Sequence, residues 1–179
     1  MKAPERVETD RLVLRKPRLE DAEAIFARYA SDPDVTRYLA WPRHEDVEQT
    51  RAFLRFSEAE WERWPAGPYL VEAKPDGRLL GSTGLAFETD HTASTGYVLA
   101  QDAWGRGLAT EALLAIVALA PSLGIERLYA VCHTDHRPSA RVLEKGGLTR
   151  ETLLEGHFEF PNLAPGELCD VYRYVMEFE

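Results

Sequence analysis

The segment from Tyr97 to Ala112 constrains the fold of this chain most strongly. Its first residues read as a strand, glycines follow at Gly105 and Gly107, and an apolar helical pattern then begins. Glycine allows left-handed backbone conformations and lets a backbone approach a ligand closely. The first N–H groups of a helix have no intrahelical partner and carry partial positive charge, so a strand, a glycine turn and a helix together favour phosphate binding.

Taken alone, this loop leaves two alternatives open. Gly105 and Gly107 also suit a turn in which glycine merely eases the passage from strand to helix. The loop is not a Walker loop, because no Gly-Lys-Ser/Thr follows, and Thr110 stands in the place of the third glycine of the dinucleotide fingerprint. A nucleotide-binding α/β domain with the same loop is therefore an alternative, and the missing lysine argues against it.

Hydrophobic periodicity predicts alternating strands and helices along the whole chain. Asp32-Pro33 is expected to end the first helix, residues 74–77 to form a hairpin turn, and Thr83-Gly84 to mark a β-bulge. This order predicts one α/β or α+β domain over 1–179 with a mixed sheet. Strands are expected at 11–16, 69–73, 79–87, 95–99, 128–132, 148–154 and 168–178, and helices near 22–29, 47–61, 109–120 and 138–145.

Composition excludes several classes of protein. The chain has 179 residues, 45% of them hydrophobic, which suits a single core. Its net charge of -9 makes it a poor binder of nucleic acid or of anionic membranes, and the longest apolar run, 112–120, is too short to span a bilayer. Cys132 and Cys169 lie in apolar contexts that suggest buried free thiols and no metal site. With no apolar signal segment at its start, the chain is expected to be cytoplasmic.

Four segments carry a resemblance to a known family. They are Glu8–Arg15 (ETDRLVLR), Leu80–Leu85 (LGSTGL), Gly96–Ala112 with its WGRGLATEA loop, and Ser139–Leu148 (SARVLEKGGL). In this order and at these separations the chain resembles the GNAT superfamily of acyl-CoA N-acyltransferases, in particular its ribosomal-protein-N-acetyltransferase-like branch. The resemblance implies a mixed, mostly antiparallel sheet of about seven strands flanked by about four helices, splayed between the fourth and fifth predicted strands.

The same resemblance implies acetyl-CoA as co-substrate and no metal. The pantetheine arm would lie between the splayed strands and pair with backbone groups of Val98, Leu99 and Ala100. His136 and Ser139, from the helix that begins near Pro138, would line the other side of the arm. Backbone N–H groups of the loop would hold the pyrophosphate, namely those of Trp104, Gly105, Arg106, Gly107, Leu108, Ala109 and Thr110.

The implied reaction is direct transfer of an acetyl group to a primary amine, but the expected catalytic positions differ. Ser94 stands where the branch often has a glutamate base, and Leu143 stands where the wider family often has a tyrosine acid. His136 replaces a common asparagine; it would relay a proton, or only cap the helix or bind the arm. Ser139 would donate to the thioester or cap the helix. Near Ser94, the alternative bases are Glu88, Asp90 and His91.

The acceptor side is expected around Trp41 and the last hairpin, where Glu159 and Asp170 would attract a cationic amine. Core packing for Trp41 and a dimer contact for the hairpin are the alternatives, so a homodimer is one expected partner state. The implied acceptor is a protein N-terminus, or a small amine or antibiotic, with no nucleic acid or membrane partner. The missing glutamate and tyrosine keep a non-catalytic acyl-CoA-binding module as the alternative function.

Overall fold

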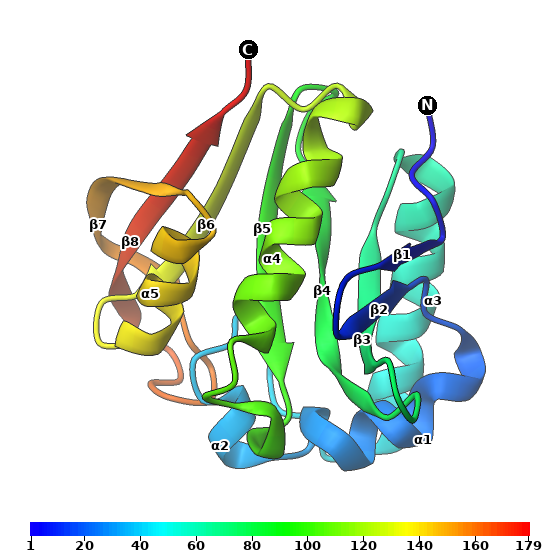
Figure 1. Cartoon of the computed structure of the whole chain (residues 1–179). Coiled ribbons are helices and arrows are strands. Elements are labelled where there is room, and N and C mark those ends of the chain that lie inside the picture. Colours follow the sequence, from blue (N-terminus) through cyan, green and yellow to red (C-terminus); the bar gives the residue numbers. More distant parts are fainter.

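An eight-stranded sheet organises the chain in the computed structural model, which describes residues 1–179 (Figure 1). The strand order is β1-β2-β3-β4-β5-β6-β8-β7, and every neighbouring pair is antiparallel except β5 and β6. The expected mixed, mostly antiparallel sheet is therefore confirmed. The strands are β1 Arg6–Glu8, β2 Leu12–Arg15, β3 Pro68–Ala73, β4 Leu79–Phe87, β5 Thr92–Leu99, β6 Arg127–His133, β7 Thr149–Glu159 and β8 Leu168–Glu177.

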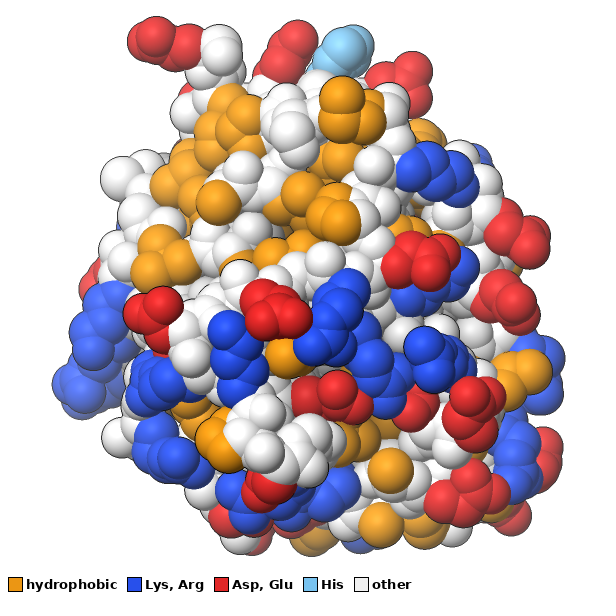
Figure 2. Space-filling view, turned by 45° about the vertical axis from the view of Figure 1, so that its right-hand side comes forward, with side chains coloured by type: hydrophobic (Ala, Val, Ile, Leu, Met, Phe, Trp, Pro, Cys, Tyr) orange, Lys and Arg blue, Asp and Glu red, His pale blue; other side chains and the backbone are white.

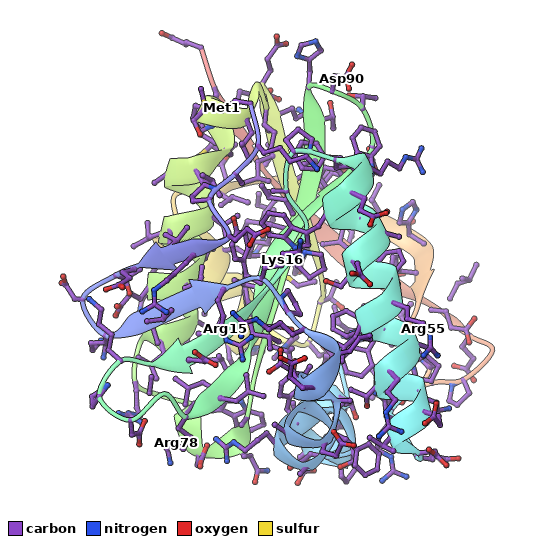
Figure 3. The ribbon with its side chains drawn as sticks, turned by 90° about the vertical axis from the view of Figure 1, so that its right-hand side faces the viewer. Met1, Arg15, Lys16, Arg55, Arg78 and Asp90 are labelled. Atoms are coloured by element: carbon purple, nitrogen blue, oxygen red, sulfur yellow. The ribbon has the colours of Figure 1, made fainter.

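Helices cover both faces of this sheet. α4 and α5 lie together on one face (Figure 1), and a view along the sheet shows α4 on one side and α3 on the other (Figure 3). The α-helices are α1 Ala22–Ile25, α2 Pro33–Thr36, α3 Val47–Arg63, α4 Leu108–Leu119 and α5 Arg137–Lys145, and a π-helical turn, Phe26–Ala30, follows α1.

Strand alternation divides the core between these two layers. Leu70 and Val98 pack with the cluster formed by α1 and α3, whereas their neighbours Val71 and Leu99 pack with the cluster under α4. Successive strand side chains point to opposite faces, so a sheet that is covered twice needs apolar residues at consecutive positions. This double cover explains why β3 and β5 carry apolar runs in place of an apolar–polar alternation.

Two expected boundaries differ in the structure. Asp32-Pro33 begins α2 as well as ending the preceding turn, because the Asp32 carboxylate accepts hydrogen bonds from the N–H groups of Asp34 (2.8 Å) and Val35 (3.2 Å). The predicted bulge at Thr83-Gly84 is wrong: the β3–β4 register shifts beside Val71 instead. A side chain at Gly84 would lie 2.7 Å from the Gly67 carbonyl oxygen, so close backbone packing explains this glycine.

The surface is divided by character. Figure 2 shows hydrophobic side chains gathered on the upper part of one face and charges of both signs below them. On α4, Leu114 and Ala118 are exposed, so part of the apolar surface of this helix faces solvent. None of the helices combines the length and the apolar character that a membrane crossing requires.

Candidate active site

The two central strands separate, as the family resemblance implies. β5 and β6 pair only over Thr92–Ser94 and Arg127–Tyr129. Beyond Ser94 the strands diverge, and β6 continues to pair with β8 on its other side. The sheet is thereby opened next to the glycine loop, at the end of β5 where α4 begins.

A cleft of about 770 Å³ occupies this opening. One wall is the far half of β5 and the loop that leads into α4, and the opposite wall is α5. The segment around Tyr38 borders it as well. Of the twelve residues expected to bind the co-substrate, all but Ala100 and Arg106 line the cleft; those that do are Val98, Leu99, Trp104, Gly105, Gly107, Leu108, Ala109, Thr110, His136 and Ser139.

The glycine loop presents a row of free hydrogen-bond donors. Gly105 and Gly107 have positive φ angles of 70° and 75°, conformations that favour glycine. The backbone N–H groups from Gly105 to Thr110 donate to no acceptor within the chain. Consecutive free donors at the start of a twelve-residue helix are an arrangement that favours anion binding. The residues present therefore fit a bound diphosphate.

The opening motif of the chain holds this loop in place. The Arg11 guanidinium donates from Nη1 to the Arg106 carbonyl oxygen (2.9 Å) and from Nε to Glu111 Oε2 (2.7 Å). The Thr9 hydroxyl donates to Glu111 Oε1 (2.5 Å). Burial alone would raise the pKa of Glu111, but the bonds from Thr9 and Arg11 outweigh it and lower that pKa. The Glu8–Arg15 motif and the glycine-loop motif are thus joined by the Arg11–Glu111 salt bridge, which we call the latch.

Cations without a carboxylate partner stand on the other wall. Arg141 and Lys145 lie one turn apart on α5 and line the cleft, and neither forms a salt bridge. Arg106 is likewise unpaired on the loop side. In a chain of net charge -9, this group of free cations beside free N–H donors favours a polyanionic ligand at this end of the cleft.

Backbone groups of β5 also face the opening. The Val98 carbonyl oxygen lies only 1.9 Å from where a side chain on Gly81 would begin, so it points toward β4. Peptide groups alternate in direction along a strand, and those of Tyr97 and Leu99 therefore point toward the gap. Val98, which the sequence analysis grouped with them, contributes its side chain to the cleft.

Two hydrogen bonds fix the end of β5. The Ala100 N–H donates to the Leu80 carbonyl oxygen (2.7 Å), which ties the end of β5 to β4. The half-exposed Trp104 indole donates from Nε1 to the Leu99 carbonyl oxygen (2.8 Å) and covers the end of the strand. Trp104 thus braces the turn between β5 and the glycine loop through its side chain.

His136 belongs to a chain of aromatic rings in contact. Its imidazole lies on the Tyr38 ring at a centroid distance of 4.5 Å and an angle of 14°. Tyr38 contacts His133 at 5.2 Å, and His133 contacts Phe160 at 5.1 Å. Burial, with a smaller effect of His133, lowers the pKa of His136 to about 4. The ring is therefore neutral at pH 7 and packs between α5 and the segment that follows α2.

Ser139 is held by a tyrosine from the opposite wall. The Tyr97 hydroxyl lies 2.9 Å from Ser139 Oγ and donates to the Ser139 carbonyl oxygen (2.8 Å). Tyr97 lines the cleft, yet the sequence analysis did not select it, although it stands inside the Gly96-Tyr97 motif. Its partner is 42 residues away, so no local pattern indicates the contact.

The expected alternative bases lie at the wrong end of the sheet. Asp90 occupies the β4–β5 turn, at the opposite end of the molecule from Arg78 in Figure 3. Arg78 immediately precedes β4, whose Gly81 pairs with Leu99 beside the cleft. The nine residue-to-residue steps from Asp90 to Leu99 span about 30 Å in an extended chain. Neither Asp90 nor its neighbours Glu88 and His91 line the cleft, and Ser94 does not line it.

Asn162 joins two segments near the predicted acceptor side through contacts that the sequence analysis did not foresee. Its amide donates to the carbonyl oxygens of Thr36 (2.8 Å) and Trp41 (2.9 Å), and its Oδ1 accepts from the Arg43 N–H (2.7 Å). The loop after β7 is thereby fastened to the segment between α2 and α3. Half-buried Trp41 packs against the α1–α3 cluster and stands 4.9 Å from the His44 ring.

Glu159 and Asp170 are exposed and lie outside the cleft lining. Glu159 Oε1 accepts from the Gly166 N–H (3.1 Å), and Asp170 Oδ1 accepts from the Gly156 N–H (2.8 Å). Glu159 thus stabilises the loop between β7 and β8, and Asp170 stabilises the irregular part of β7 where the register shifts. The carboxylates that do line the cleft are Asp34 and Asp135, neither of which the sequence analysis placed on the acceptor.

The fold and the cleft define the class of protein. Residues 11–149 match the acetyltransferase (GNAT) domain family, and the chain belongs to that family of acetyltransferases. Among named relatives, the uncharacterized N-acetyltransferase YoaA of Bacillus subtilis (strain 168) is 34% identical over 172 residues, which cover 94% of this chain and 96% of YoaA.

Solved structures agree with this assignment. A GNAT-family acetyltransferase from Bacillus anthracis superposes with a TM-score of 0.83 at 27% identity, over 96% of this chain and 98% of that one. RimL, a ribosomal L7/L12 α-N-protein acetyltransferase solved with coenzyme A, shares the fold at 20% identity, with a TM-score of 0.86 over 97% and 98% of the two chains. The resemblance drawn from the sequence motifs is thereby confirmed.

Proposed function

We propose that this protein transfers an acetyl group from acetyl-CoA directly to a primary amine. The observation that carries the proposal is the row of free N–H donors at the start of α4, set beside strands that part. Acetyl-CoA supplies an acyl thioester, an acetyl donor that an amine attacks directly. Neither cysteine offers a covalent route: Cys132 is buried, Cys169 is half-buried on β8, and neither lines the cleft.

The walls of the cleft have separate tasks in this proposal. The N–H groups from Gly105 to Thr110 hold the pyrophosphate, and Arg11 keeps their loop in position. Arg141 and Lys145 attract the remaining phosphate charge. The backbone groups of Tyr97 and the N–H of Leu99, which face the gap, orient the pantetheine arm. The thioester is then directed toward the end of the cleft bordered by Tyr38 and His136.

Deprotonation of the amine decides which acceptors suit this site. A lysine side chain with a pKa near 10.4 is only about 0.04% neutral at pH 7, a cost of roughly 4–5 kcal/mol. An α-amine with a pKa near 7.7–8.0 is about 10–17% neutral, which costs about 1 kcal/mol. Because the cleft lacks a glutamate on β5, we propose an α-amine, at the N-terminus of a protein or peptide, as the acceptor.

His136 is a positioning group in this proposal. A base whose conjugate acid has a pKa of about 4 accepts a proton from an ammonium group only against a gradient of several pKa units. Its stack on Tyr38 instead fixes the wall beside the thioester. We expect His136→Ala to reduce acetyl-CoA affinity and turnover together. A loss of turnover with unchanged acetyl-CoA affinity would instead favour the role of His136 as a proton relay.

The deciding experiment measures thiol release from acetyl-CoA over a panel of amines. The panel contains short peptides with free and with blocked N-termini, a polyamine, single amino acids and an aminoglycoside. The proposal expects release with free N-termini, and mass spectrometry should find the acetyl group on the α-nitrogen. Binding of acetyl-CoA without thiol release for any amine would favour a non-catalytic acyl-CoA-binding module.

A further inference from the structure

The Tyr97–Ser139 contact is the one hydrogen bond between side chains that joins the far half of β5 to α5 across the cleft. The phenol ring comes from the strand wall and packs against the cluster that contains Cys132 and Leu143. Its oxygen lies 2.9 Å from Ser139 Oγ and 2.8 Å from the Ser139 carbonyl oxygen. Both residues line the cleft.

These distances allow two arrangements of protons. In one, the phenol donates to the Ser139 carbonyl and accepts the Ser139 hydroxyl proton, which leaves no donor for a ligand. In the other, the phenol donates to Ser139 Oγ, and the serine proton is free to point into the cleft. A ligand atom that carries negative charge favours the second arrangement, because each donor in a chain of hydrogen bonds strengthens the next.

We propose that Tyr97 is a positioning residue that acts through Ser139: it donates to Ser139 Oγ and so directs the serine proton at the thioester sulfur. The inference rests on the proposed function and names the residue that orients the Ser139 donor toward the leaving group. No cation lies within hydrogen-bond distance of this hydroxyl pair. Burial raises the pKa of Tyr97, so the phenol keeps its proton at neutral pH.

The chemistry balances without a proton leaving Tyr97. The amine nitrogen forms a bond to the acetyl carbon, the C–S bond breaks, and its electron pair stays on sulfur. The Ser139 hydroxyl stabilises this thiolate by a hydrogen bond and retains its proton. The proton lost by the amine passes to water, and the thiolate takes a proton from water as the product leaves. A thiol pKa near 8.5 makes such a thiolate a tolerable leaving group near neutral pH.

Tyr174 provides a matched control. It packs in the same apolar cluster, and its hydroxyl donates to Glu144 on the same helix (2.9 Å), but it does not line the cleft. Tyr174→Phe and Tyr97→Phe each remove one phenol oxygen bonded to α5. A purely structural role of Tyr97 therefore predicts similar effects of the two substitutions.

The first test reads the thiol of bound coenzyme A by its ultraviolet thiolate absorbance during a pH titration, with no amine present. We expect the wild-type protein to lower the pKa of that thiol by about one unit, a tenfold change in thiolate. Tyr97→Phe and Ser139→Ala should both return it toward the free value, whereas Ser139→Thr and Tyr174→Phe should preserve it. The inference would be overturned if the wild-type protein left the thiol pKa unchanged, or if Tyr174→Phe lost the pKa shift as fully as Tyr97→Phe.

The second test uses turnover with the best amine of the panel. Tyr97→Phe and Ser139→Ala should each lower kcat about 10- to 100-fold with little change in the KM of acetyl-CoA, which is the range for a hydrogen bond to a charged group. The double variant should be no slower than Ser139→Ala. Multiplying losses would refute the inference. If the wild-type protein shifts the thiol pKa but acetylates no amine, the proposed function is refuted and the inference on Tyr97 is not.

Discussion

Gly107→Glu gives the most direct test of the phosphate site. Gly107 has φ 75° and ψ 10° and stands immediately before α4. A β-carbon added there would find one neighbour within 4 Å, Nη2 of Arg11 at 3.6 Å, which is an ordinary contact. The substitution therefore fits without a steric clash. Its carboxylate would enter the region where the free N–H groups are proposed to hold a diphosphate.

The expected loss of coenzyme A binding free energy has two parts that can be measured separately. Any non-glycine residue at this φ costs about 1–2 kcal/mol, but Gly107→Ala bears the same cost. The extra effect of glutamate is electrostatic. Unit charges about 4 Å apart repel by about 1 kcal/mol in bulk water and about 4 kcal/mol near a protein surface. An intermediate value of about 2 kcal/mol corresponds to about 30-fold weaker binding of coenzyme A, relative to Gly107→Ala.

Isothermal titration calorimetry with coenzyme A measures both variants and the wild type. At low salt we expect Gly107→Glu to bind about 30-fold more weakly than Gly107→Ala. This difference in affinity should become smaller in 1 M salt, where the electrostatic screening length falls to about 3 Å. Equal affinities of the two variants at low salt would refute the phosphate assignment. A difference in affinity that does not change with salt would refute it as well.

Three further changes test the supports of the site. Arg11→Ala removes the bonds to the Arg106 carbonyl and to Glu111, so coenzyme A should bind about tenfold more weakly; calorimetry showing wild-type affinity would contradict the latch. Asn162→Ala frees the loop after β7, so the KM of the amine should rise several-fold while that of acetyl-CoA stays constant; the reverse pattern in steady-state kinetics would contradict this role. The depressed pKa of His136, about 4 against an ordinary 6.5, stabilises the fold above pH 6.5, and this contribution is lost as the pH falls toward 4. In denaturant titrations, the free energy of unfolding of the wild type should fall with decreasing pH by up to about 1.4 kcal/mol per pH unit more than that of His136→Asn over this interval. If the two proteins lose stability in parallel, the fold does not keep the His136 ring from protonation.

Sequence patterns determined most of the scaffold because their physical causes are local. The turn at residues 74–77, the helix predicted near 47–61 and the glycine loop before α4 all depend on backbone preferences of a few neighbouring residues. The parting of β5 and β6 was expected only through the family resemblance, since no local pattern states where two strands cease to pair. The short strand β1 and the broken helix before α2 were missed, because brief elements depend on neighbours that are distant in sequence.

The composition of the site was decided by tertiary structure. Tyr97 meets Ser139 across 42 positions, Arg11 meets Glu111 across 100, and Asn162 reaches Trp41 across 121. The same packing places Asp90, a predicted alternative base, and Glu159, which was predicted to attract the amine, outside the cleft lining. The sequence by itself predicted the strand, the glycine turn and the helix, an arrangement that favours anion binding. Which side chains face that anion depends on how separate elements pack, and packing is set by the whole core and not by any short segment.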